Sequence, residues 1–376
     1  MADNKDKKVL NVPHLRFPEF TERWDTYRIA DILCIGNGRD YKHLSKGDIP
    51  VFGTGGYMTS VNECLYEGET TFIGRKGTIN KPFYYNGKFW TVDTLFYTHS
   101  FKRVIPKFVY CLFQTINWLR YNEASGVPSL SKDTIEKIKV RIPQLDEQKK
   151  IAKLLSLLDE RIATQNKIIE DLKKLKSAII DYAINSLDTD FAKFGSLYET
   201  AGEGGTPTTS NTSFYDNGKI PFVKIDDLKQ KYLTENKDFI TELGLQKSSA
   251  WLVPTRSILF SNGASIGEIT ITTYPVCTKQ GILGIVPKSN IDVEFLYYFM
   301  SSTYFKKAIS RIVTEGTMKT AYLKDINNIL CPIPTKEKQQ GIAKMPSDMN
   351  SKIDYEQSLL KLFIMQKQYL LRQMFI

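Results

Sequence analysis

The segment RIPQLDEQKKIAK (residues 141–153) recurs in altered form as PIPTKEKQQGIAK (residues 332–344). Aligning Pro143 with Pro334 sets an offset of 191 residues, and matching glutamine, isoleucine, alanine and lysine residues follow in both copies. An internal repeat defines the architecture of a chain before any single motif does. The 376-residue sequence therefore indicates two copies of one unit, each a globular lobe that leads into the repeated segment.

Apolar residues continue beyond both copies at spacings that alternate between four and three. This is the period of a coiled-coil seam, and polar residues interrupt both seams at the same two steps, first at Gln165 and Glu356 and then at Lys176 and Lys367. We therefore expect a long helix after each lobe, and we expect the two helices to pair. The predicted seam residues are Ile151, Leu155, Leu158, Ile162, Ile169, Leu172 and Ile179 in the first helix and Met349, Ile353, Leu360, Phe363, Leu370 and Met374 in the second.

Both predicted helices are too long to be ordinary core elements of a lobe. A helix over residues 146–186 would extend about 60 Å at about 1.5 Å per residue, which exceeds the width of a lobe of about 145 residues. Pro346 lies inside the second helix, where a proline removes a hydrogen bond and clashes with the preceding turn. Because Ser347 and Asp348 follow as potential N-caps, we expect the second helix to break or restart there.

The two lobes carry weaker signals in a common order. Short β-branched and aromatic runs, divided by glycine, asparagine and proline, predict many short strands and a few helices in each lobe. The fold class is therefore α+β, with a lobe at 1–144, a helix at 145–187, a second lobe at 188–334 and a second helix at 335–376. The matched segments are 47–52 with 218–223, 71–79 with 258–266, 90–96 with 276–282, 108–113 with 295–300 and 126–130 with 316–320.

The sequence lacks the motifs of common enzymes. The glycine-rich runs at 53–56 and 202–205 lack the lysine of a phosphate-binding loop, and no glycine fingerprint for a nucleotide cofactor follows a predicted strand. The triplet Glu147–Lys149 superficially matches a nuclease metal site, but it begins an amphipathic helix, and we interpret it as a solvated helix face. The three histidines are isolated, so we expect no metal and no cofactor.

Several features favour a cytoplasmic protein. The five cysteines are odd in number and far apart, which fits reduced, mostly buried thiols. The charged segment Met1–Lys8 is followed by no apolar signal core, and no run approaches the roughly 18–20 apolar residues of a membrane span. We therefore expect neither export nor a membrane partner.

The formal net charge of +10 permits nucleic-acid binding, but the charge is unevenly distributed. Residues 1–144 hold 21 basic and 15 acidic residues, a net +6, whereas residues 188–334 hold 15 of each. The helical segments 145–187 and 335–376 carry +1 and +3. The charge alone therefore does not predict that both lobes bind DNA.

Two glycine-containing loops, at 74–78 and 261–265, carry side chains suited to contact DNA. Glycine lets the main chain approach a phosphate or base edge closely, while arginine and lysine suit guanine and asparagine and glutamine suit adenine. The alternative is that both loops are tight turns with solvated side chains. The predicted DNA-binding residues are Arg75, Lys76, Thr78, Lys81 and Ser129 in the first lobe and Ser261, Asn262, Ser265, Lys279, Gln280, Lys319 and Thr320 in the second.

Four segments resemble the specificity subunits of type I restriction–modification systems. The opening residues 12–24 and the closing residues 366–376 are similar to the ends of that family, and 142–152 and 333–343 resemble its two junctions between a recognition domain and a spacer helix. The resemblance implies a non-catalytic subunit with two target-recognition domains. It also implies antiparallel spacer helices that pair as a coiled coil with pseudo-twofold symmetry. Lys338 and Pro346 depart from the pattern, so we expect the second docking surface to differ from the first.

Each domain would then bind one half of a bipartite site in double-stranded DNA, because like units about a pseudo-twofold axis present like surfaces to opposite strands. The resemblance implies that the helices set the unspecified gap and carry two modification (methyltransferase) subunits, with restriction (translocase/endonuclease) subunits joining the complex. Inserting four residues within 160–175 should then lengthen the gap and leave the half-site sequences unchanged. The alternatives are a recognition module of an orphan or fused system, and a coiled-coil scaffold without salt-dependent DNA binding.

Overall fold

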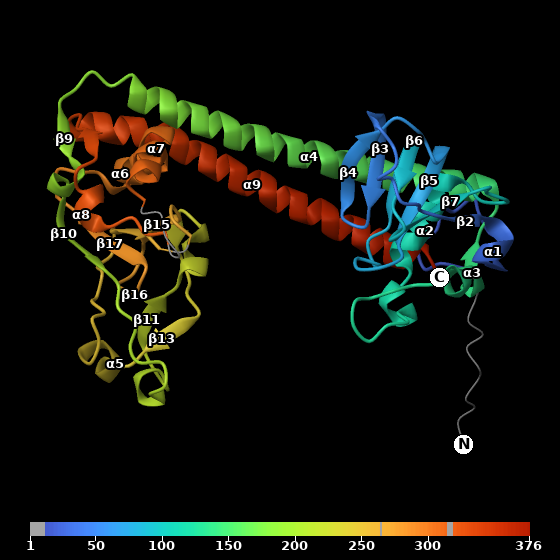
Figure 1. Cartoon of the computed structure of the whole chain (residues 1–376), viewed down its shortest axis with the longest axis horizontal. Helices are drawn as coiled ribbons and strands as arrows, with labels where there is room; N and C mark the ends of the chain where they lie inside the picture. Colours follow the sequence, from blue (N-terminus) through green and yellow to red (C-terminus); the bar gives the residue numbers. More distant parts are fainter. Residues whose placement is uncertain (1–11, 264, 314–318) are drawn as a thin grey trace. The chain divides into compact units, whose positions relative to one another are not determined.

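The chain divides into two compact units in the computed structural model, which describes residues 12–263, 265–313 and 319–376. Unit 1 comprises Met1–Lys167 and Ser358–Ile376, and unit 2 comprises Ile168–Gln357. Each unit contains one lobe together with a part of each of two long helices (Figure 1). The helices are α4 (Leu145–Asn185) and α9 (Lys336–Met374).

Each lobe consists of short strands with a few helices, in agreement with the predicted α+β class. In unit 1 the elements are β1 (Asp25–Arg28), α1 (Ile29–Ile32), β2 (Cys34–Asn37), β3 (Lys46–Gly53), β4 (Gly56–Val61), β5 (Tyr66–Gly74), β6 (Phe83–Thr91), β7 (Leu95–His99), α2 (Pro106–Thr115), η1 (Trp118–Tyr121), α3 (Lys132–Lys137) and β8 (Lys139–Ile142). In unit 2 they are β9 (Phe191–Lys193), η2 (Phe194–Ser196), β10 (Tyr198–Glu203), η3 (Thr212–Phe214), β11 (Ile220–Val223), η4 (Ile225–Lys229), β12 (Tyr232–Leu233), β13 (Asp238–Ile240), α5 (Glu242–Gln246), β14 (Ile258–Ser261), β15 (Ile269–Thr272), β16 (Cys277–Thr278), β17 (Ile282–Pro287), α6 (Val293–Ser301), α7 (Thr303–Ile312), α8 (Leu323–Ile326) and β18 (Leu330–Pro332).

Both lobes share most of one strand order, but unit 2 divides it between two sheets and adds β12, which has no counterpart among the described strands of unit 1. The six-stranded sheet of unit 1 runs β2-β7-β5-β6-β3-β4, and its β3–β6 pair is parallel. In unit 2 the sheet β10-β17-β14-β15-β12 supplies the counterparts of the first four strands, and a second sheet, β16-β11-β13, supplies the counterparts of the rest, with β11 and β16 again parallel. The antiparallel pairs β1–β8 and β9–β18 join the start of each lobe to its end. The two lobes are therefore copies of one design.

The main-chain hydrogen bonds shift the predicted match between the lobes by one residue. Val92 N donates to Phe52 O at 3.0 Å in unit 1. The equivalent bond in unit 2 runs from Lys279 N to Val223 O at 2.9 Å, so Val92 corresponds to Lys279, one residue beyond the predicted match. A difference of one residue in loop length cannot be seen in the composition of the sequence. The hydrogen bonds between paired strands, in contrast, fix which residues of the two lobes correspond. The predicted match of Gly126 with Gly316 lies outside the described residues.

The hydrophobic cores explain why each lobe needs both long helices. In unit 1 the sheet and α2 enclose Trp24 and Phe108 together with Ile151 of α4 and Met374 of α9. In unit 2 the sheet, α6 and α7 enclose a core that includes Ile184 of α4 and, on α9, Ala343 and Ile342. Burial of apolar area is the main stabilising term for such cores. The helices are therefore core elements of the units as well as partners of each other.

A buried glutamine fixes the start of α4 to the lobe of unit 1. Gln148 Nε2 donates to Arg103 O and to Pro143 O, both at 2.8 Å, and Oε1 accepts from Ile105 N at 3.1 Å. These groups lie in the segment that leads into α2 and in the turn that precedes α4. One side chain thus satisfies a main-chain N–H and two carbonyls that would otherwise be buried without partners.

The repeated glutamine makes the same bonds in unit 2. Gln339 Nε2 donates to Pro334 O at 2.9 Å and to Asn290 O at 3.3 Å, and Oε1 accepts from Asp292 N at 2.7 Å. Both glutamines are fully buried, at 0% and 1% exposure. The recurrence of glutamine in the repeated segment therefore has a geometric cause, since a residue of this length with both a donor and an acceptor is needed to join a lobe to its helix.

The long helices run antiparallel within unit 1. Ile151, near the start of α4, shares a core cluster with Met374, the last residue of α9. Further along, Lys367 of α9 donates a hydrogen bond to Asp159 of α4. The same direction holds in unit 2, where Ile184 clusters with α9 residues near its start. The predicted pairing of the helices is confirmed.

The lysines that interrupt the two seams make equivalent contacts. Lys176 of α4 donates to Asn350 Oδ1 of α9 at 2.7 Å, and Lys367 of α9 bonds to Asp159 of α4. The offset of 191 residues that relates Lys176 to Lys367 also relates Asp159 to Asn350. The two contacts are therefore equivalent within the repeat. Burial lowers the pKa of Lys176, whose hydrogen-bond acceptor is a neutral amide.

The predicted seam residues occupy the inner faces of both helices. None of them is exposed, and the polar seam residues Gln165 and Glu356 are 6% and 7% exposed. The buried members are Ile151, Leu155, Leu158, Ile169, Ile353 and Met374, and the half-buried members are Ile162, Leu172, Ile179, Met349, Leu360, Phe363 and Leu370.

The predicted break at Pro346 is wrong, because α9 is one helix from Lys336 to Met374 with Pro346 inside it. An internal proline costs about 3 kcal/mol or more. Pro346 is buried, and its neighbours Ala343 and Ile353 are 4% exposed, so burial on both sides offsets that cost. Ser347, which was expected to cap a new helix, instead bonds to the lobe.

Replacing either repeated glutamine by alanine should destabilise its unit. Gln148→Ala leaves a buried N–H without its acceptor and two carbonyls without their donor, and Gln339→Ala does the same in unit 2. We expect a loss of about 2–3 kcal/mol in the free energy of unfolding, measured by urea denaturation. The exposed residues Gln144 and Gln340 provide matched controls, whose alanine variants should stay within about 0.5 kcal/mol of the parent. Equal losses in all four variants would contradict the assigned role.

Candidate nucleic-acid interface

Arg75 lies where three segments of the first lobe meet. It directly follows β5, its N–H donates to Thr94 O at 2.8 Å, and its carbonyl accepts from Leu130 N at 2.9 Å. Its Nη1 donates to Asp93 O at 3.3 Å, and the guanidinium carbon lies 5.9 Å from the centre of the Phe96 ring. The backbone of Arg75 is therefore fixed, and its side chain is half-buried at the end of the sheet.

Three more predicted residues of the first lobe surround Arg75. Lys76 forms an isolated β-bridge with Ser129, which places the loop after β5 beside the loop before α3. Lys76 and Thr78 are exposed, and Gly77 between them has a φ of +84°, a conformation that glycine adopts without strain. Lys81 is exposed as well, but no contact among the described residues joins it to this loop.

The loop after β2 adds Arg39, which no motif revealed. Gly38 N donates to Leu95 O at 3.2 Å, and in unit 2 Gly204 N donates to Ile282 O at 2.8 Å, so the two glycines are equivalent. A Cβ at either glycine would lie 1.9 or 2.3 Å from a carbonyl oxygen of the neighbouring strand, which excludes any larger residue. Arg39 follows Gly38 and is exposed. A glycine repeated near the start of both lobes was the signal that could have located this loop.

The β3–β4 hairpin places a second overlooked group beside the Arg75 loop. Thr54 Oγ1 would lie 3.8 Å from a Cβ on Gly77, so the tip of the hairpin touches that loop. Tyr57 and Met58 follow the tip and are 64% and 51% exposed. Exposed aromatic side chains beside basic residues are typical of surfaces that pack against nucleic-acid bases. We call Arg39, Tyr57, Arg75, Lys76, Thr78 and Ser129 the first strand-end cluster.

The second lobe brings the equivalent segments together. Asn262, the counterpart of Arg75, donates from its backbone N to Gly281 O at 3.0 Å and accepts at its backbone O from Ala321 N at 2.9 Å. These bonds place the loop after β14 beside the β16–β17 turn and the segment before α8. Gln280 N donates to Thr206 Oγ1 at 3.3 Å, which adds the loop after β10. We call Thr206, Ser265, Lys279, Gln280, Lys319 and Thr320 the second strand-end cluster; Ser265, Lys279, Gln280 and Lys319 are exposed and Thr320 is half-buried.

Two predicted contact residues of the second lobe lie inside it. Ser261 and Asn262 are 0% and 1% exposed. The Ser261 hydroxyl donates to Ser265 O and accepts from Glu268 N at 2.8 Å, while Asn262 Nδ2 donates to Ala321 O at 3.3 Å. Both side chains therefore shape the loop from within. The sequence showed polar residues on a loop but gave no indication of which of them face inward.

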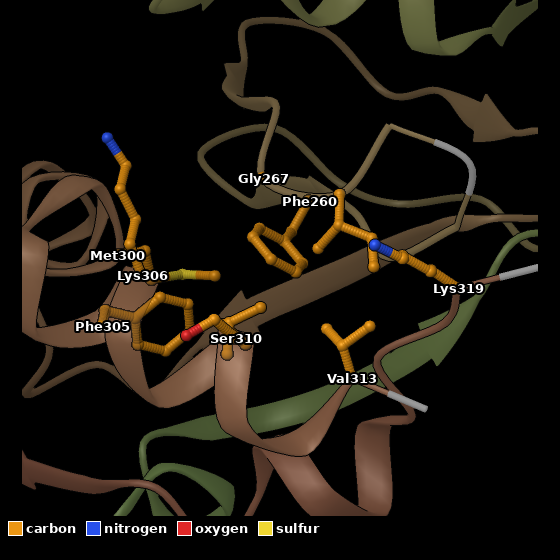
Figure 2. Close-up of a pocket in the computed structure, with 10 residues that line it drawn as sticks. Phe260, Gly267, Met300, Phe305, Lys306, Ser310, Val313 and Lys319 are labelled. Carbon is orange, nitrogen blue, oxygen red and sulfur yellow. The ribbon is translucent and has the colours of Figure 1, made fainter. Parts of the chain in front are cut away.

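A cavity of about 330 Å³ adjoins the second strand-end cluster. Figure 2 shows Phe260 and Phe305 facing this space, with Lys319 reaching over it. Its lining among the described residues contains no carboxylate, imidazole or thiol. A metal site can therefore not be built from that lining, whose polar side chains are Lys306, Ser310 and Lys319.

The two strand-end clusters differ in charge. The first contains Arg39, Arg75 and Lys76, with Asp93 beside them. The second contains Lys279 and Lys319, with Glu203 beside them, whose carboxylate accepts from Gly281 N at 3.0 Å. This contrast agrees with the count of +6 over residues 1–144 and zero over residues 188–334. Electrostatic attraction to phosphate is therefore stronger at the first cluster.

The predicted solvated helix face at Glu147 is wrong. Glu147 is 1% exposed, and both of its carboxylate oxygens accept hydrogen bonds from Arg16, from Nε and Nη2, at 2.7 Å. A buried carboxylate requires a partner, and the opening segment of the chain supplies one. Arg16 lies far away in sequence, so the triplet gave no sign of this pair. The carboxylate is fully engaged and is not arranged as a metal ligand.

The remaining titratable groups provide no metal-binding cluster among the described residues. No group of three or more histidine, cysteine, aspartate or glutamate side chains there could hold a metal ion. Burial raises the pKa of Cys111 to about 12 and that of Cys277 to about 11, so both are neutral thiols at pH 7. In the part of the chain that the structure covers, no helix is both long and apolar enough to span a membrane.

Comparison with known proteins agrees with the duplicated architecture. The sequence model of the type I restriction modification DNA specificity domain matches the chain twice, over residues 21–174 and 188–362. The chain is 26% identical over 390 residues to the putative type I restriction enzyme MjaX specificity subunit of Methanocaldococcus jannaschii, covering 90% of this chain and 89% of that one. It is also 26% identical over 280 residues to the MjaIX specificity subunit of the same organism, with 65% of this chain and 64% of that relative covered.

A solved structure has the same fold. The type I restriction–modification system S subunit from M. genitalium matches with a TM-score of 0.62 at 16% identity, covering 97% of this chain and 99% of that one. The two family matches each span one lobe and most of the helix that follows it. The chain therefore belongs to the family of type I restriction modification DNA specificity domains, and it carries two copies of that domain.

Proposed function

We propose that this chain is the non-catalytic specificity subunit of a type I restriction–modification complex in the cytoplasm. Each lobe binds one half of a bipartite site in double-stranded DNA through its strand-end cluster. The paired helices α4 and α9 set the gap between the half-sites. The helices also bind two modification subunits, and restriction subunits then join the complex.

The observation that carries this proposal is the repetition of the strand-end loops. Both lobes bring three loops together through the same main-chain hydrogen bonds: the segment after β5 or β14, the turn before β7 or β17, and the loop before α3 or α8. The exposed side chains on these loops differ, with Arg39 and Lys76 in one lobe and Lys279, Gln280 and Lys319 in the other. A constant scaffold with variable loops is the arrangement expected of two readers that recognise different base sequences.

The outer faces of the helices support the proposed partners. In unit 1 Leu157 of α4 and Leu362, Met365 and Tyr369 of α9 are 53% to 59% exposed. In unit 2 Leu175 and Tyr182 of α4 are 52% and 76% exposed. Apolar side chains repeated along one helix face, at spacings such as the seven residues from Leu362 to Tyr369, are typical of a surface that packs against another helix. We infer that the modification subunits bind there.

The proposal is tested by co-expressing the chain with its modification subunit and mapping methylated bases genome-wide. We expect one motif of two short half-sites separated by a fixed number of unspecified bases. An undivided motif, or methylation without any motif, would contradict the proposal. A scaffold without a DNA role gives no salt-dependent duplex binding, and an orphan or fused system gives the motif without an associated restriction subunit.

Arg75 and Lys76 should affect DNA binding in different ways. Arg75→Ala should relax the preference at one base of the first half-site by about 1–3 kcal/mol, or roughly 5- to 150-fold, because a guanidinium can bond a base edge in two places. Lys76→Ala should weaken binding to all sequences and reduce the slope of log affinity against log salt by about one. The measurement is fluorescence anisotropy with duplexes that vary in each half-site. The exposed Lys88 of β6 is the control, and a comparable loss in Lys88→Ala would contradict the assignment.

Lengthening both helices together should lengthen the gap. Seven residues inserted between Lys167 and Ile168 and seven between Gln357 and Ser358 preserve the seam and add about 10 Å at about 1.5 Å per residue, which is about three base pairs. The sequence also led us to expect a longer gap from a four-residue insertion within 160–175 of α4 alone. That insertion changes only one of the paired helices and moves Lys176 out of register with Asn350, so the double insertion is the cleaner test. Methylation mapping should show unchanged half-sites with a longer gap. An unchanged gap in a folded double-insertion variant would exclude the helices as the spacer.

A further inference from the structure

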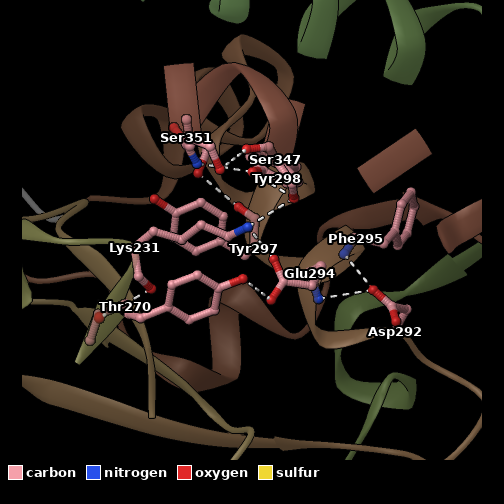
Figure 3. Close-up of polar contacts among 12 residues, drawn as sticks. Lys231, Thr270, Asp292, Glu294, Phe295, Tyr297, Tyr298, Ser347 and Ser351 are labelled. Atoms are coloured by element: carbon pink, nitrogen blue, oxygen red, sulfur yellow. Dashed lines mark hydrogen bonds and ion pairs between the residues drawn. The ribbon is translucent and has the colours of Figure 1, made fainter. Parts of the chain in front are cut away.

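Lys231 ties the sheet of the second lobe to α6. It directly precedes β12, and its carbonyl accepts from Ile271 N at 2.8 Å. Its side chain is 10% exposed and forms an ion pair with Glu294, and Nζ lies 4.7 and 4.8 Å from the ring centres of Tyr298 and Tyr232 (Figure 3). Burial by itself would lower the pKa of Lys231, but hydrogen bonds to Glu294 and the two tyrosines raise it, so the ammonium remains charged.

The same ammonium also reaches α9. Lys231 Nζ donates to Ser347 Oγ at 2.9 Å, and that hydroxyl lies 3.1 Å from Tyr298 OH. Asn350, three residues further along α9, donates to Tyr298 OH at 2.9 Å and accepts from Lys176 of α4 at 2.7 Å. A continuous set of polar side chains thus connects the sheet, α6 and α9 within unit 2 (Figure 3), and Asn350 extends it to Lys176 of α4. We call Lys231, Glu294, Tyr298, Ser347 and Asn350 the Lys231 bridge.

Unit 1 does not repeat this bridge. The residue equivalent to Glu294 is Lys107, since the offset of 187 that relates Arg103 to Asn290 also relates Lys107 to Glu294. Helix α2 instead meets α9 through Tyr110, whose ring centre lies 5.5 Å from Lys367 Nζ. With Lys107 in place of Glu294, the described residues of unit 1 contain no equivalent of the Lys231–Glu294 ion pair. The Lys231 bridge is therefore a property of the second lobe and not of the duplicated design.

A buried ion pair restricts geometry more than an apolar contact does. The Glu294 carboxylate receives Tyr232 OH on Oε1 at 2.7 Å and the Lys231 ammonium on Oε2, so both oxygens are engaged. The pair holds the Lys231 ammonium where it donates to Ser347 of α9. A shift of the lobe along α9 would break this bond and the bond from Asn350 to Tyr298, whereas apolar side chains can slide and repack. Buried ion pairs often add little net stability relative to apolar replacements. Their effect is instead to favour one packing arrangement over the alternatives.

To distinguish between gap lengths, a lobe must be held in one orientation on its helices. Adding one base pair to the gap moves a half-site by about 3.4 Å along the DNA axis and rotates it by roughly 34°, because B-DNA has about 10.5 base pairs per turn. A lobe that tilts freely on its helices would follow such a displacement and accept the wrong gap. A lobe held by directional contacts would reject it.

We propose that the Lys231 bridge consists of positioning residues that fix the orientation of the second lobe on α9 and thereby make the recognised gap exact to one base pair. This inference rests on the function proposed above. It assigns gap accuracy to a junction within one lobe, separate from the gap length that the helices set. The bridge residues do not contact DNA in this role, so the half-site sequences do not depend on them.

The test replaces the buried ion pair by apolar residues of similar size. The variant Lys231→Met/Glu294→Leu is assembled with the modification subunit and assayed for methylation of duplexes whose gap is the native length, one base pair shorter or one longer. We expect the preference for the native gap to fall at least ten-fold, while the half-site preferences stay unchanged. The exposed pair Asp226 and Lys229 provides the matched control, Asp226→Leu/Lys229→Met, which should keep the parent's preference.

A second variant removes the hydroxyl at the centre of the bridge while keeping the ring. Tyr298→Phe loses the contacts to Ser347 and Asn350, and we expect a smaller fall in gap preference in the same direction. If the Lys231→Met/Glu294→Leu variant does not fold, the gap preference of Tyr298→Phe tests the inference on its own. A parent-like gap preference in folded variants would overturn the inference, as would an equal loss of activity on all three gaps. If the parent complex itself shows no bipartite motif, the proposed function fails instead.

Discussion

The antiparallel pairing of α4 and α9 is the constraint on which the other features depend. A lysine from one helix meets an oxygen of the other at equivalent places in the two units, Lys367 at Asp159 and Lys176 at Asn350. These lysines lie inside otherwise apolar seams, where a misaligned pairing would leave a buried ammonium without an acceptor. The polar interruptions therefore select one register for two helices whose apolar seams alone could pair in several.

The lobes depend on this pairing because neither completes its core alone. The core of unit 1 includes the first turns of α4 and the last turn of α9, and the core of unit 2 includes the opposite ends of both helices. Gln148 and Gln339 then fix each lobe to the start of the helix that follows it. Because each helix belongs to both cores, a recognition domain of this family cannot be considered apart from its spacer. Because Gln148 and Gln339 make the same hydrogen bonds, the duplication extends to individual contacts as well as to the order of the elements.

Duplication has left the two halves with different properties. The first strand-end cluster is basic and has the exposed Tyr57 hairpin, whereas β11 of the second lobe leads into a 3-10 turn. The second lobe instead has the Lys231 bridge to α9. These differences suit a protein whose halves must bind different base sequences on a common frame. The first strand-end cluster therefore carries more basic side chains than the second, while only the second lobe is tied to α9 through the Lys231 bridge.

The sequence by itself determined the repeat, the α+β class, the two long helices and their seams, because these features depend on local composition and on periods that recur along the chain. The helix register could be seen in the matched positions of Lys176 and Lys367, although their acceptors could not. Strand order, the inward orientation of Ser261 and Asn262, and the Arg16–Glu147 pair depended on contacts between residues distant in sequence.

Pro346 shows the same division between local and tertiary control. Local chemistry predicts a break, and the tertiary structure keeps the helix continuous because burial of its neighbours offsets the lost hydrogen bond. No local sequence pattern indicates the Lys231 bridge, because its groups come from the segment before β12, from α6 and from α9. A buried charge is specified only once the fold brings its partners to it, and that pairing is decided by packing rather than by the order of residues.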